Sequence, residues 1–416
     1  MENVNWYKMD NVAKVFLATC SKRDTRTLRL SCTLKEDVDP EILQKAVLLA
    51  IYDRPQFQVR IRRGIFWHYL EDTDIEPVVT EEHDRICPVL YVPAKAMLHY
   101  QVTYFGRRIN LDMFHALADG TGAMEFLKII VFHYIQLKHP GRFEETNILS
   151  GASEDDLNQD SYKQFFGNKG LVKSESYGKA YHPRGIKLPY NQLQFFEIHM
   201  PAKQILAKVK ELNVSLTSYI AAAWMLAIYG DMPPLRRNMP VTISLPVNLR
   251  NYYPSNTSRN FFNNVSVSHV FDKETSIEEL AAEFDARLKS LLTEDNIKAQ
   301  MDSFETMEYV APVRPVPLFI KQRVVKYFTA RSNRKVSMVL SNMGKQSMPG
   351  ELNDMVETFT GFCSSNNIFS TIFSFKDDLS LGVASPYMNT GVVKNMVRRL
   401  SESGIDIKVY ATEVFK

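Results

Sequence analysis

One short stretch of the sequence combines residue types that can transfer a proton. His115 is followed four positions later by Asp119, and Gly120 comes directly after the aspartate. An imidazole, with an unperturbed pKa of ~6.5, can take a proton from a hydroxyl or an amine near neutral pH and return it later. His115 is therefore a candidate general base. Asp119 has two overlapping interpretations, because it can cap the helix that follows or pair with an arginine that fixes the His115 loop.

The elements around this stretch are predicted to be a strand, a bend and a helix. Residues 97–105 and 108–114 have the alternating pattern of a hairpin, and they lead the chain to His115. Apolar residues between Ala123 and Ile135 then recur at helical spacing. A bend between a strand and a helix can expose a side chain that the flanking elements hold still.

The overall composition limits the kind of protein. The chain has 416 residues, 45% of them hydrophobic and 23% charged, which favours two globular domains. Lys and Arg number 50 against 47 Asp and Glu, so the formal net charge is +3. Such a balance gives no overall field that would hold nucleic acid or an anionic membrane, and leaves only local basic patches for such contacts.

Cysteine usage and the N-terminus indicate a cytoplasmic protein. The four cysteines are far apart and form no CxxC pair, so we expect reduced thiols, no disulfide framework and no metal site; they are Cys20, Cys32, Cys87 and Cys363. The N-terminus has no basic segment followed by an apolar one, and no apolar run approaches the ~18 residues of a membrane span. Motifs of nucleotide hydrolases, dinucleotide-binding proteins, zinc peptidases and serine hydrolases do not occur.

Both halves of the chain alternate predicted strands with predicted helices. The first half has strand patterns at 27–34, 57–61 and 65–70 and a helix pattern at 39–51. The second half has strand patterns at 195–200, 241–245, 262–270, 336–340, 354–362, 369–375, 379–384 and 405–410. It has helix patterns at 202–212, 215–229, 276–292, 392–400 and from the proline-rich stretch 312–317 to residue 327. This alternation predicts an α/β protein whose sheets are covered by helices.

A change of composition separates the two halves. Residues 153–156 are acidic, and 169–187 are basic and rich in Gly, Ser and Tyr, which is typical of a solvated connection between domains. The predicted division is an N-terminal lobe at 1–175, a linker at 176–190 and a C-terminal lobe at 191–416.

The His115 stretch and several other segments resemble a known superfamily. His115-Ala-Leu-Ala-Asp119-Gly120 matches the HxxxDG motif of chloramphenicol acetyltransferase-like acyltransferases, which include condensation domains of peptide synthetases. The segments WYKMDN at 6–11, LPVNLR at 245–250 with the asparagines at 263–264, and LSNMG at 340–344 are similar to its stand-alone alcohol acetyltransferase branch, in the same order. The resemblance covers nearly the whole chain.

The resemblance implies both a fold and a reaction. The fold is an α+β sandwich of two chloramphenicol acetyltransferase-like lobes, a pseudo-dimer with a tunnel between them. Acyl donor and acceptor enter from opposite faces, and the histidine deprotonates the acceptor, which attacks the thioester without an acyl-enzyme. His115 takes that role by motif position, and Asp119 would bind Arg250 as a structural brace. No bound cofactor is implied, because acyl-coenzyme A is a co-substrate.

Other candidate residues follow from the same resemblance. Ser341 is a candidate oxyanion donor, with Asn342 beside it in the segment that passes the reaction centre. Asn263 and Asn264 either line the tunnel or form turns. Basic residues that would meet the phosphates of coenzyme A, or else form a solvated helix face, are Lys321, Arg323, Lys326, Arg331, Arg334 and Lys335.

Two departures from the superfamily narrow the expected function. Phe114 stands where condensation domains have a second histidine, and the DFGWG segment of the plant BAHD enzymes does not occur. Both favour a stand-alone enzyme that moves an acetyl or other short acyl group from free acyl-coenzyme A to the hydroxyl or amine of a small molecule. The alternatives are a donor tethered to a carrier protein and a non-catalytic binding module on the same fold.

Overall fold

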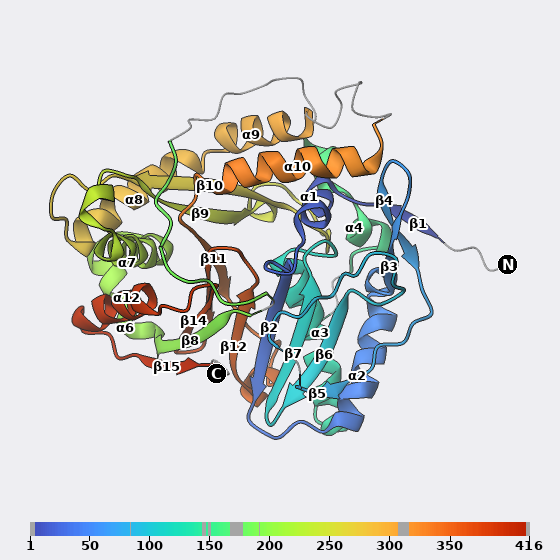
Figure 1. Ribbon diagram of the computed structural model, residues 1–416. Coiled ribbons are helices and arrows are strands. Elements are labelled where there is room, and N and C mark those ends of the chain that lie inside the picture. The colour runs from blue at the N-terminus through green and yellow to red at the C-terminus, as the bar shows by residue number, and fades with distance from the viewer. Residues whose placement is uncertain are drawn as a thin grey trace.

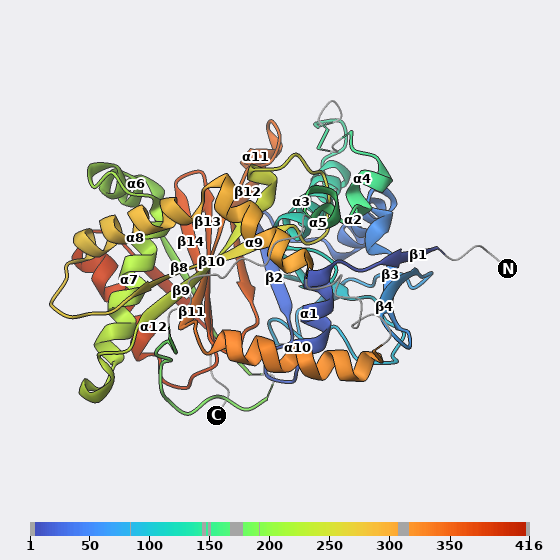
Figure 2. The same cartoon turned by 90° about the horizontal axis from the view of Figure 1, so that it is seen from above.

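The computed structural model describes residues 5–83, 85–143, 147–148, 151–166, 178–190, 192–306 and 316–412. Its framework is a five-stranded sheet and a seven-stranded sheet, both packed against helices (Figure 1). Seen from above, the seven-stranded sheet and its helices lie at the end of the molecule away from the N-terminus (Figure 2). The predicted α/β architecture is confirmed.

The five-stranded sheet contains the strand that leads to His115. Its strands, in sheet order, are β12 (Val356–Cys363), β2 (Thr27–Leu34), β7 (Arg108–Phe114), β6 (Tyr100–Phe105) and β5 (Thr80–Glu81). The helices α2 (Pro40–Asp53) and α3 (Gly120–Lys138) pack against it. Leu111 of β7 lies in one buried apolar core with Val47 of α2 and Phe126 of α3. Burial of this apolar surface fixes the end of β7, from which the His115 loop starts.

The seven-stranded sheet is built by the second half of the chain. Its strands, in sheet order, are β10 (Phe262–His269), β9 (Val241–Asn248), β11 (Met338–Lys345), β13 (Ile368–Phe375), β14 (Asp378–Ser385), β8 (Gln194–Pro201) and β15 (Lys408–Ala411). Its helices are α6 (Ala202–Glu211), α7 (Leu216–Asp231), α8 (Ile277–Leu291) and α12 (Gly391–Glu402). α7 is apolar all round because α6, α8 and α12 enclose it.

β12 joins the two halves, because it comes from the second half of the sequence but pairs with β2. It also packs against β13 and β14 of the other sheet. A Cβ atom on Gly382 of β14 would lie 1.8 Å from the carbonyl oxygen of Gly361 in β12, so only glycine permits this approach. The segment 191–416 therefore contributes strands to both sheets, and the predicted domain boundaries stay a prediction.

The remaining elements surround these sheets. A three-stranded sheet has the order β1 (Trp6–Lys8), β4 (His68–Asp72) and β3 (Val59–Arg63). The other helices are α1 (Asn11–Thr19), α4 (Glu154–Asn158), α5 (Ser161–Phe165), α9 (Glu294–Thr306), α10 (Leu318–Asn333) and α11 (Leu352–Met355). The described residues also form the short 3₁₀ helices η1 (Pro55–Phe57), η2 (Pro234–Arg236) and η3 (Leu249–Asn251).

Most predicted elements are present within a few residues of their expected bounds. The capping box of Ser276 and Glu279 begins α8 as expected. α1 and α9 were not predicted, because α1 is short and α9 is mostly polar. Residues 312–315 of the proline-rich stretch, and residues 167–177 with the predicted lobe boundary, lie outside the described residues.

In the described part of the chain, no single helix is long and apolar enough to cross a bilayer. α6 and α7 meet the criteria only as a pair, and the chain bends by 91° between them.

Candidate active site

His115 follows the last residue of β7 and begins the loop that leads into α3. Its backbone N–H donates a hydrogen bond to the carbonyl oxygen of Arg26, 2.8 Å away, and Phe114 before it is fully buried. The ring of Phe16, from α1, lies against the imidazole with the ring centroids 4.3 Å apart. Phe262 of β10 lies against it at 5.9 Å. Two aromatic rings thus restrict the half-buried imidazole.

A hydrogen bond with Asn260, in the loop before β10, defines the tautomer of His115. Its Nδ1 lies 3.2 Å from the amide oxygen of Asn260. Because that oxygen can only accept, Nδ1 carries the hydrogen and Nε2 keeps its lone pair. The amide nitrogen of Asn260 donates to Asp10 at 3.3 Å, and Asp10 caps α1 by accepting the N–H of Ala13 at 2.6 Å.

The same surroundings shift the pKa values of the two titratable groups. Burial lowers the pKa of His115, although the Asp119 charge and the hydrogen bond with Asn260 act in the opposite direction. Burial raises the pKa of Asp10 to about 6, against the hydrogen bond from Ala13. An imidazole whose pKa is lowered is neutral near pH 7, which is the form that accepts a proton.

Asp119 makes both kinds of contact that its position suggested. One carboxylate oxygen accepts the N–H of Gly122 at 2.9 Å and caps α3. The other lies 2.7 Å from Nη1 of Arg250 and accepts the N–H of Phe261 at 2.9 Å. The ion pair implied by the resemblance is therefore present. That it serves as a brace for the site stays a prediction.

Arg250 holds the loop that supplies Asn260. Its Nη2 donates to the carbonyl oxygens of Thr257 at 2.8 Å and Arg259 at 2.7 Å, while Nη1 binds Asp119. Asn260 follows directly in the chain and contacts His115. The ion pair is thus connected to the imidazole on two routes, through the His115 loop and through the Asn260 loop.

A close approach of backbones requires glycine in the first turn of α3. A Cβ atom on Gly122 would lie 2.1 Å from the carbonyl oxygen of Ser258, in the loop that Arg250 holds. A Cβ atom on Gly120 would instead meet the flexible end of Met343, with Sδ at 2.8 Å. Gly122 is therefore the glycine that allows this loop to lie against α3.

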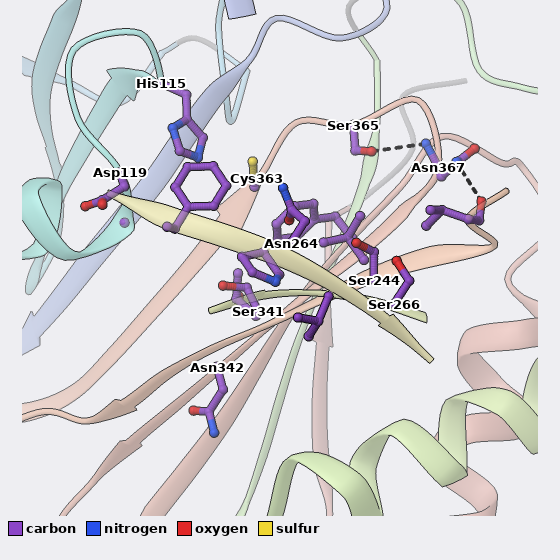
Figure 3. Close-up of a pocket in the computed structure, with 18 of the residues that line it drawn as sticks. His115, Asp119, Ser244, Asn264, Ser266, Ser341, Asn342, Cys363, Ser365 and Asn367 are labelled. Carbon is purple, nitrogen blue, oxygen red and sulfur yellow. Dashed lines mark hydrogen bonds between the residues drawn. The ribbon is translucent and has the colours of Figure 1, made fainter. Parts of the chain in front are cut away.

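A cavity of about 1040 Å³ includes His115 in its wall and is lined from both sheets. Figure 3 shows His115 and Asp119 toward one end and Ser244, Ser266 and Asn367 toward the other. The apolar part of the wall includes Leu28, Leu30, Phe362, Phe369 and Phe373. A polar part, from β9 and β10, includes Thr242, Ser244, Asn264, Ser266 and Ser268. The cavity therefore offers both apolar surface and neutral hydrogen-bonding groups.

The predicted serine and asparagine candidates differ in whether they line the cavity. Ser341, Asn342 and Asn264 line the cavity. The Asn342 amide donates to a threonine hydroxyl of α7 at 2.9 Å. Asn263 points to the other face of β10, where its amide donates to Gln300 at 3.0 Å. Of the adjacent asparagines, Asn264 is thus the one in the cavity wall.

The basic residues predicted to bind coenzyme A also differ in whether they line the cavity. Lys321 is buried, with its ammonium 3.4 Å from the centroid of the Trp67 ring. Arg323 and Lys326 are exposed on α10 and do not line the cavity. Basic residues in the cavity wall are Arg26, Arg287 and Lys335.

The sequence reasoning missed two contacts of His115, Asn260 and Phe16, and also Asp10, which binds Asn260. Asn260 ends a polar loop that looked like any surface loop, and Phe16 lies in α1, which was not predicted. Asp10 lies within the opening segment that resembles the superfamily, but nothing local connects it with a residue 250 positions later. The position of Asn260 two residues before a predicted strand was the available signal.

Other chemistries find little support in the described part of the molecule. Cys363 lines the cavity, but burial raises the pKa of its thiol to about 12, so it stays protonated. Among the described residues, no group of three or more His, Cys, Asp or Glu is arranged to hold a metal ion.

Comparison with known families identifies the protein family of the chain. The sequence profile named alcohol acetyltransferase matches residues 189–398, which is half of the chain. The chain belongs to this family. The matched part contains Arg250, Asn260 and Ser341, whereas His115 and Asp119 precede it. The alcohol acetyltransferase family is one of acyltransferases, in agreement with the resemblance of the HxxxDG motif.

Several solved structures have the same fold as this chain. Polyketide synthase associated protein 5 from Mycobacterium tuberculosis matches with a TM-score of 0.62 and 15% identity over 95% of this chain and 97% of that one. TRI101 from F. sporotrichioides, complexed with coenzyme A and T-2, matches with a TM-score of 0.62 and 11% identity over 97% and 99%. The first condensation domain of the CDA synthetase matches with a TM-score of 0.61 and 11% identity over 95% of both chains. A search of curated protein sequences finds no match.

Proposed function

We propose that the protein transfers an acetyl or other short acyl group from acyl-coenzyme A to the hydroxyl or amine of a small molecule. The observation that carries the proposal is the His115 imidazole at the cavity wall, with Nδ1 engaged by Asn260 and the lone pair on Nε2. Membership of the alcohol acetyltransferase family and the coenzyme A complex of TRI101 support it.

In this mechanism His115 acts as the general base. Nε2 takes the proton of the acceptor hydroxyl while the hydroxyl oxygen attacks the thioester carbonyl, and a tetrahedral oxyanion forms. The oxyanion collapses, the carbon–sulfur bond breaks, and the leaving thiolate takes the proton back from Nε2. Ester and free thiol leave, and no acyl-enzyme forms. Burial favours this cycle because it keeps the resting imidazole neutral.

Four other residues receive supporting roles. Asp119 and Arg250 brace the His115 loop through the contacts described above. Ser341, in the cavity wall, is the candidate donor to the oxyanion. Among the basic residues first considered for coenzyme A, Lys335 is the candidate for its phosphates, because it alone of that group lines the cavity.

The test is a turnover assay with the purified chain. Several acyl-coenzyme A donors are incubated with pooled alcohols and amines, while released thiol and product mass are measured. We expect thiol release that depends on an acceptor, together with a product heavier by the acyl group. Acceptor-dependent turnover that is unchanged in His115→Ala would refute the role of His115 as the general base.

The fold shared with a condensation domain supports one second candidate, in which the acyl donor is bound to a carrier protein. Phe114 at the position of the second histidine speaks against it. Turnover with a loaded carrier protein, but not with free acyl-coenzyme A, would favour this candidate. A lack of turnover with either donor, together with tight binding of a protein partner, would instead favour a non-catalytic module.

A further inference from the structure

α10 presents more large apolar side chains to the outside than to the protein. The exposed ones are 41–63% accessible and number five of its sixteen residues: Phe319, Ile320, Val324, Tyr327 and Phe328. Its buried residues are Leu318 and Lys321. A surface helix ordinarily turns its apolar stripe toward the core, so this helix has the opposite arrangement.

The tip of the β3–β4 hairpin extends this apolar surface. The N–H of Leu318 donates to the carbonyl oxygen of Ile65 at 3.0 Å, which brings the hairpin tip against the start of α10. Ile65 and Phe66 are 76% and 43% exposed. Figure 1 shows α10 running across the top of the molecule from this hairpin, and Figure 2 shows it along one edge beside α1. We name these seven exposed side chains of α10 and the hairpin tip the α10 face.

The charged residues of the chain segment that carries α10 have a single sign. No Asp or Glu occurs between residues 316 and 350. Arg323, Lys326, Arg331 and Arg334 are exposed on α10 and directly after it. The whole chain is nearly neutral, with a formal charge of +3, so this basic surface is a local concentration. An apolar face among basic residues fits a partner that is apolar within and anionic at its surface.

The α10 face also leads to the cavity. Ser332, Asn333 and Lys335, at the end of α10 and just beyond it, line the same cavity as His115. A surface that binds along α10 would therefore lie next to one end of that cavity.

We propose that the α10 face docks the protein on the surface of an anionic lipid bilayer, with α10 lying in the interface. Phenylalanine, tyrosine and aliphatic side chains enter the boundary between headgroups and acyl chains, while the arginine and lysine side chains reach lipid phosphates. A second copy of the chain is the poorer occupant, because two basic faces brought together repel each other. The apolar residues are also interleaved with basic ones along a single helix, an arrangement that suits a deformable bilayer.

The experiment is co-sedimentation of the full chain with lipid vesicles. One set is phosphatidylcholine alone, and the other contains about 30% phosphatidylglycerol, at low salt and at about 1 M salt, where the Debye length falls to about 3 Å. We expect binding to the anionic vesicles at low salt, and at least about tenfold weaker partition without anionic lipid or at high salt. This readout requires no turnover, so it can fail or succeed independently of the proposed reaction.

Matched variants connect the binding with the α10 face. Tyr327→Ser combined with Phe328→Ser should lower partition about tenfold or more, since two rings leave the interface, without changing the melting temperature. The control is Leu235→Ser with Leu206→Ser, which removes two exposed apolar side chains outside the α10 face and should leave partition unchanged.

Three outcomes would overturn the proposal. The first is no preference for anionic vesicles, and the second is equal partition of both double variants. The third is a concentration-dependent dimer, or binding of an acidic carrier protein in the absence of vesicle binding, that the Tyr327 and Phe328 substitutions abolish. That result would assign the α10 face to a protein partner.

Discussion

β7 lies between two ion pairs that connect distant parts of the chain. Arg108, its first residue, makes two hydrogen bonds of 2.8 Å to the carboxylate of Glu197 in β8. Beyond its last residue, Asp119 pairs with Arg250 at 2.7 Å. Both pairs are largely shielded from solvent, so a simple count of salt bridges would treat them alike.

Their surroundings make them different. Glu197 also contacts His199 at 2.8 Å, and His199 contacts Asp378 at 3.0 Å. This network therefore joins side chains of β7, β8 and β14, and backbone hydrogen bonds already hold each of these strands in its sheet. Arg250 instead binds the carbonyl oxygens of an irregular loop that ends at Asn260. The first network should affect stability alone, whereas the second should also affect the position of His115. An ion pair matters to chemistry when it holds backbone that nothing else holds.

The largest expected effect is on activity, and it distinguishes His115, beside the Asp119–Arg250 ion pair, from His199, in the Glu197 network. His115→Ala removes the proposed base and should lower kcat/KM by about 10³-fold, at an unchanged melting temperature. His199→Ala should lower the melting temperature by several degrees and leave kcat/KM within about twofold, because Glu197 and Asp378 lose the cation they share and His199 is not part of the cavity wall. Thiol release and thermal unfolding measure the two quantities. Comparable loss of activity in both variants would break the comparison.

The next effect compares the two carboxylates by isosteric substitution. Asp119→Asn should destabilise the protein by about 3 kcal/mol, since Arg250 loses its buried partner. It should also lower kcat/KM by on the order of 10²-fold, because the His115 loop shifts. Glu197→Gln should cost stability only. Denaturant unfolding and kcat/KM give both numbers, and an equal activity loss in Glu197→Gln would contradict the distinction.

A third prediction uses pH. Burial alone would lower the pKa of His199, but Asp378 and Glu197 raise it to about 9. A raised pKa means that this stabilisation is complete below the unfolded value of ~6.5 and is lost as the pH rises through 9. Burial of Glu197 is outweighed by His199 and Arg108, which lower its pKa to about 2, so its contribution is lost only as the pH falls from ~4.3 toward 2.

The activity should follow a different course over the same range. Because the pKa of His115 is lowered, its base form is already dominant at pH 6.5 and stays so up to pH 9. Between these values we expect stability to fall by on the order of 2 kcal/mol while kcat/KM stays level. Denaturant unfolding and initial rates at matched pH values measure this. A parallel fall of both quantities would show that the two regions are coupled.

Local patterns were sufficient to predict the elements that carry His115. The β6–β7 hairpin, the bend and α3 are consecutive in sequence, and each has its own periodicity or turn residue. Arg250 could be named only because a second segment resembled the superfamily. The fold class followed from the alternation of strands and helices in the same way.

Long-range contacts could not be predicted from these patterns. The pairing of β12 with β2 joins strands more than 300 residues apart, and no periodicity encodes a partner strand. The hydrogen bond between Asn260 and His115 spans 145 residues, and an asparagine at the end of a loop has a common local explanation. The cavity itself is formed by side chains from both sheets, so it exists only in the folded protein.

The smallest effect tests Asn260, which connects the Arg250 loop with the imidazole. Asn260→Ala removes the acceptor of Nδ1–H and should lower kcat about tenfold with little change in KM, because the imidazole then populates the wrong tautomer part of the time. Asn260→Asp places a carboxylate there instead, which favours the charged imidazole and should move the acidic limb of the pH–rate profile upward by about one unit. A residue with a merely structural role would lower stability and leave that limb unmoved. An unmoved limb in a folded Asn260→Asp variant would therefore show that the Arg250 loop supports the fold and not the base.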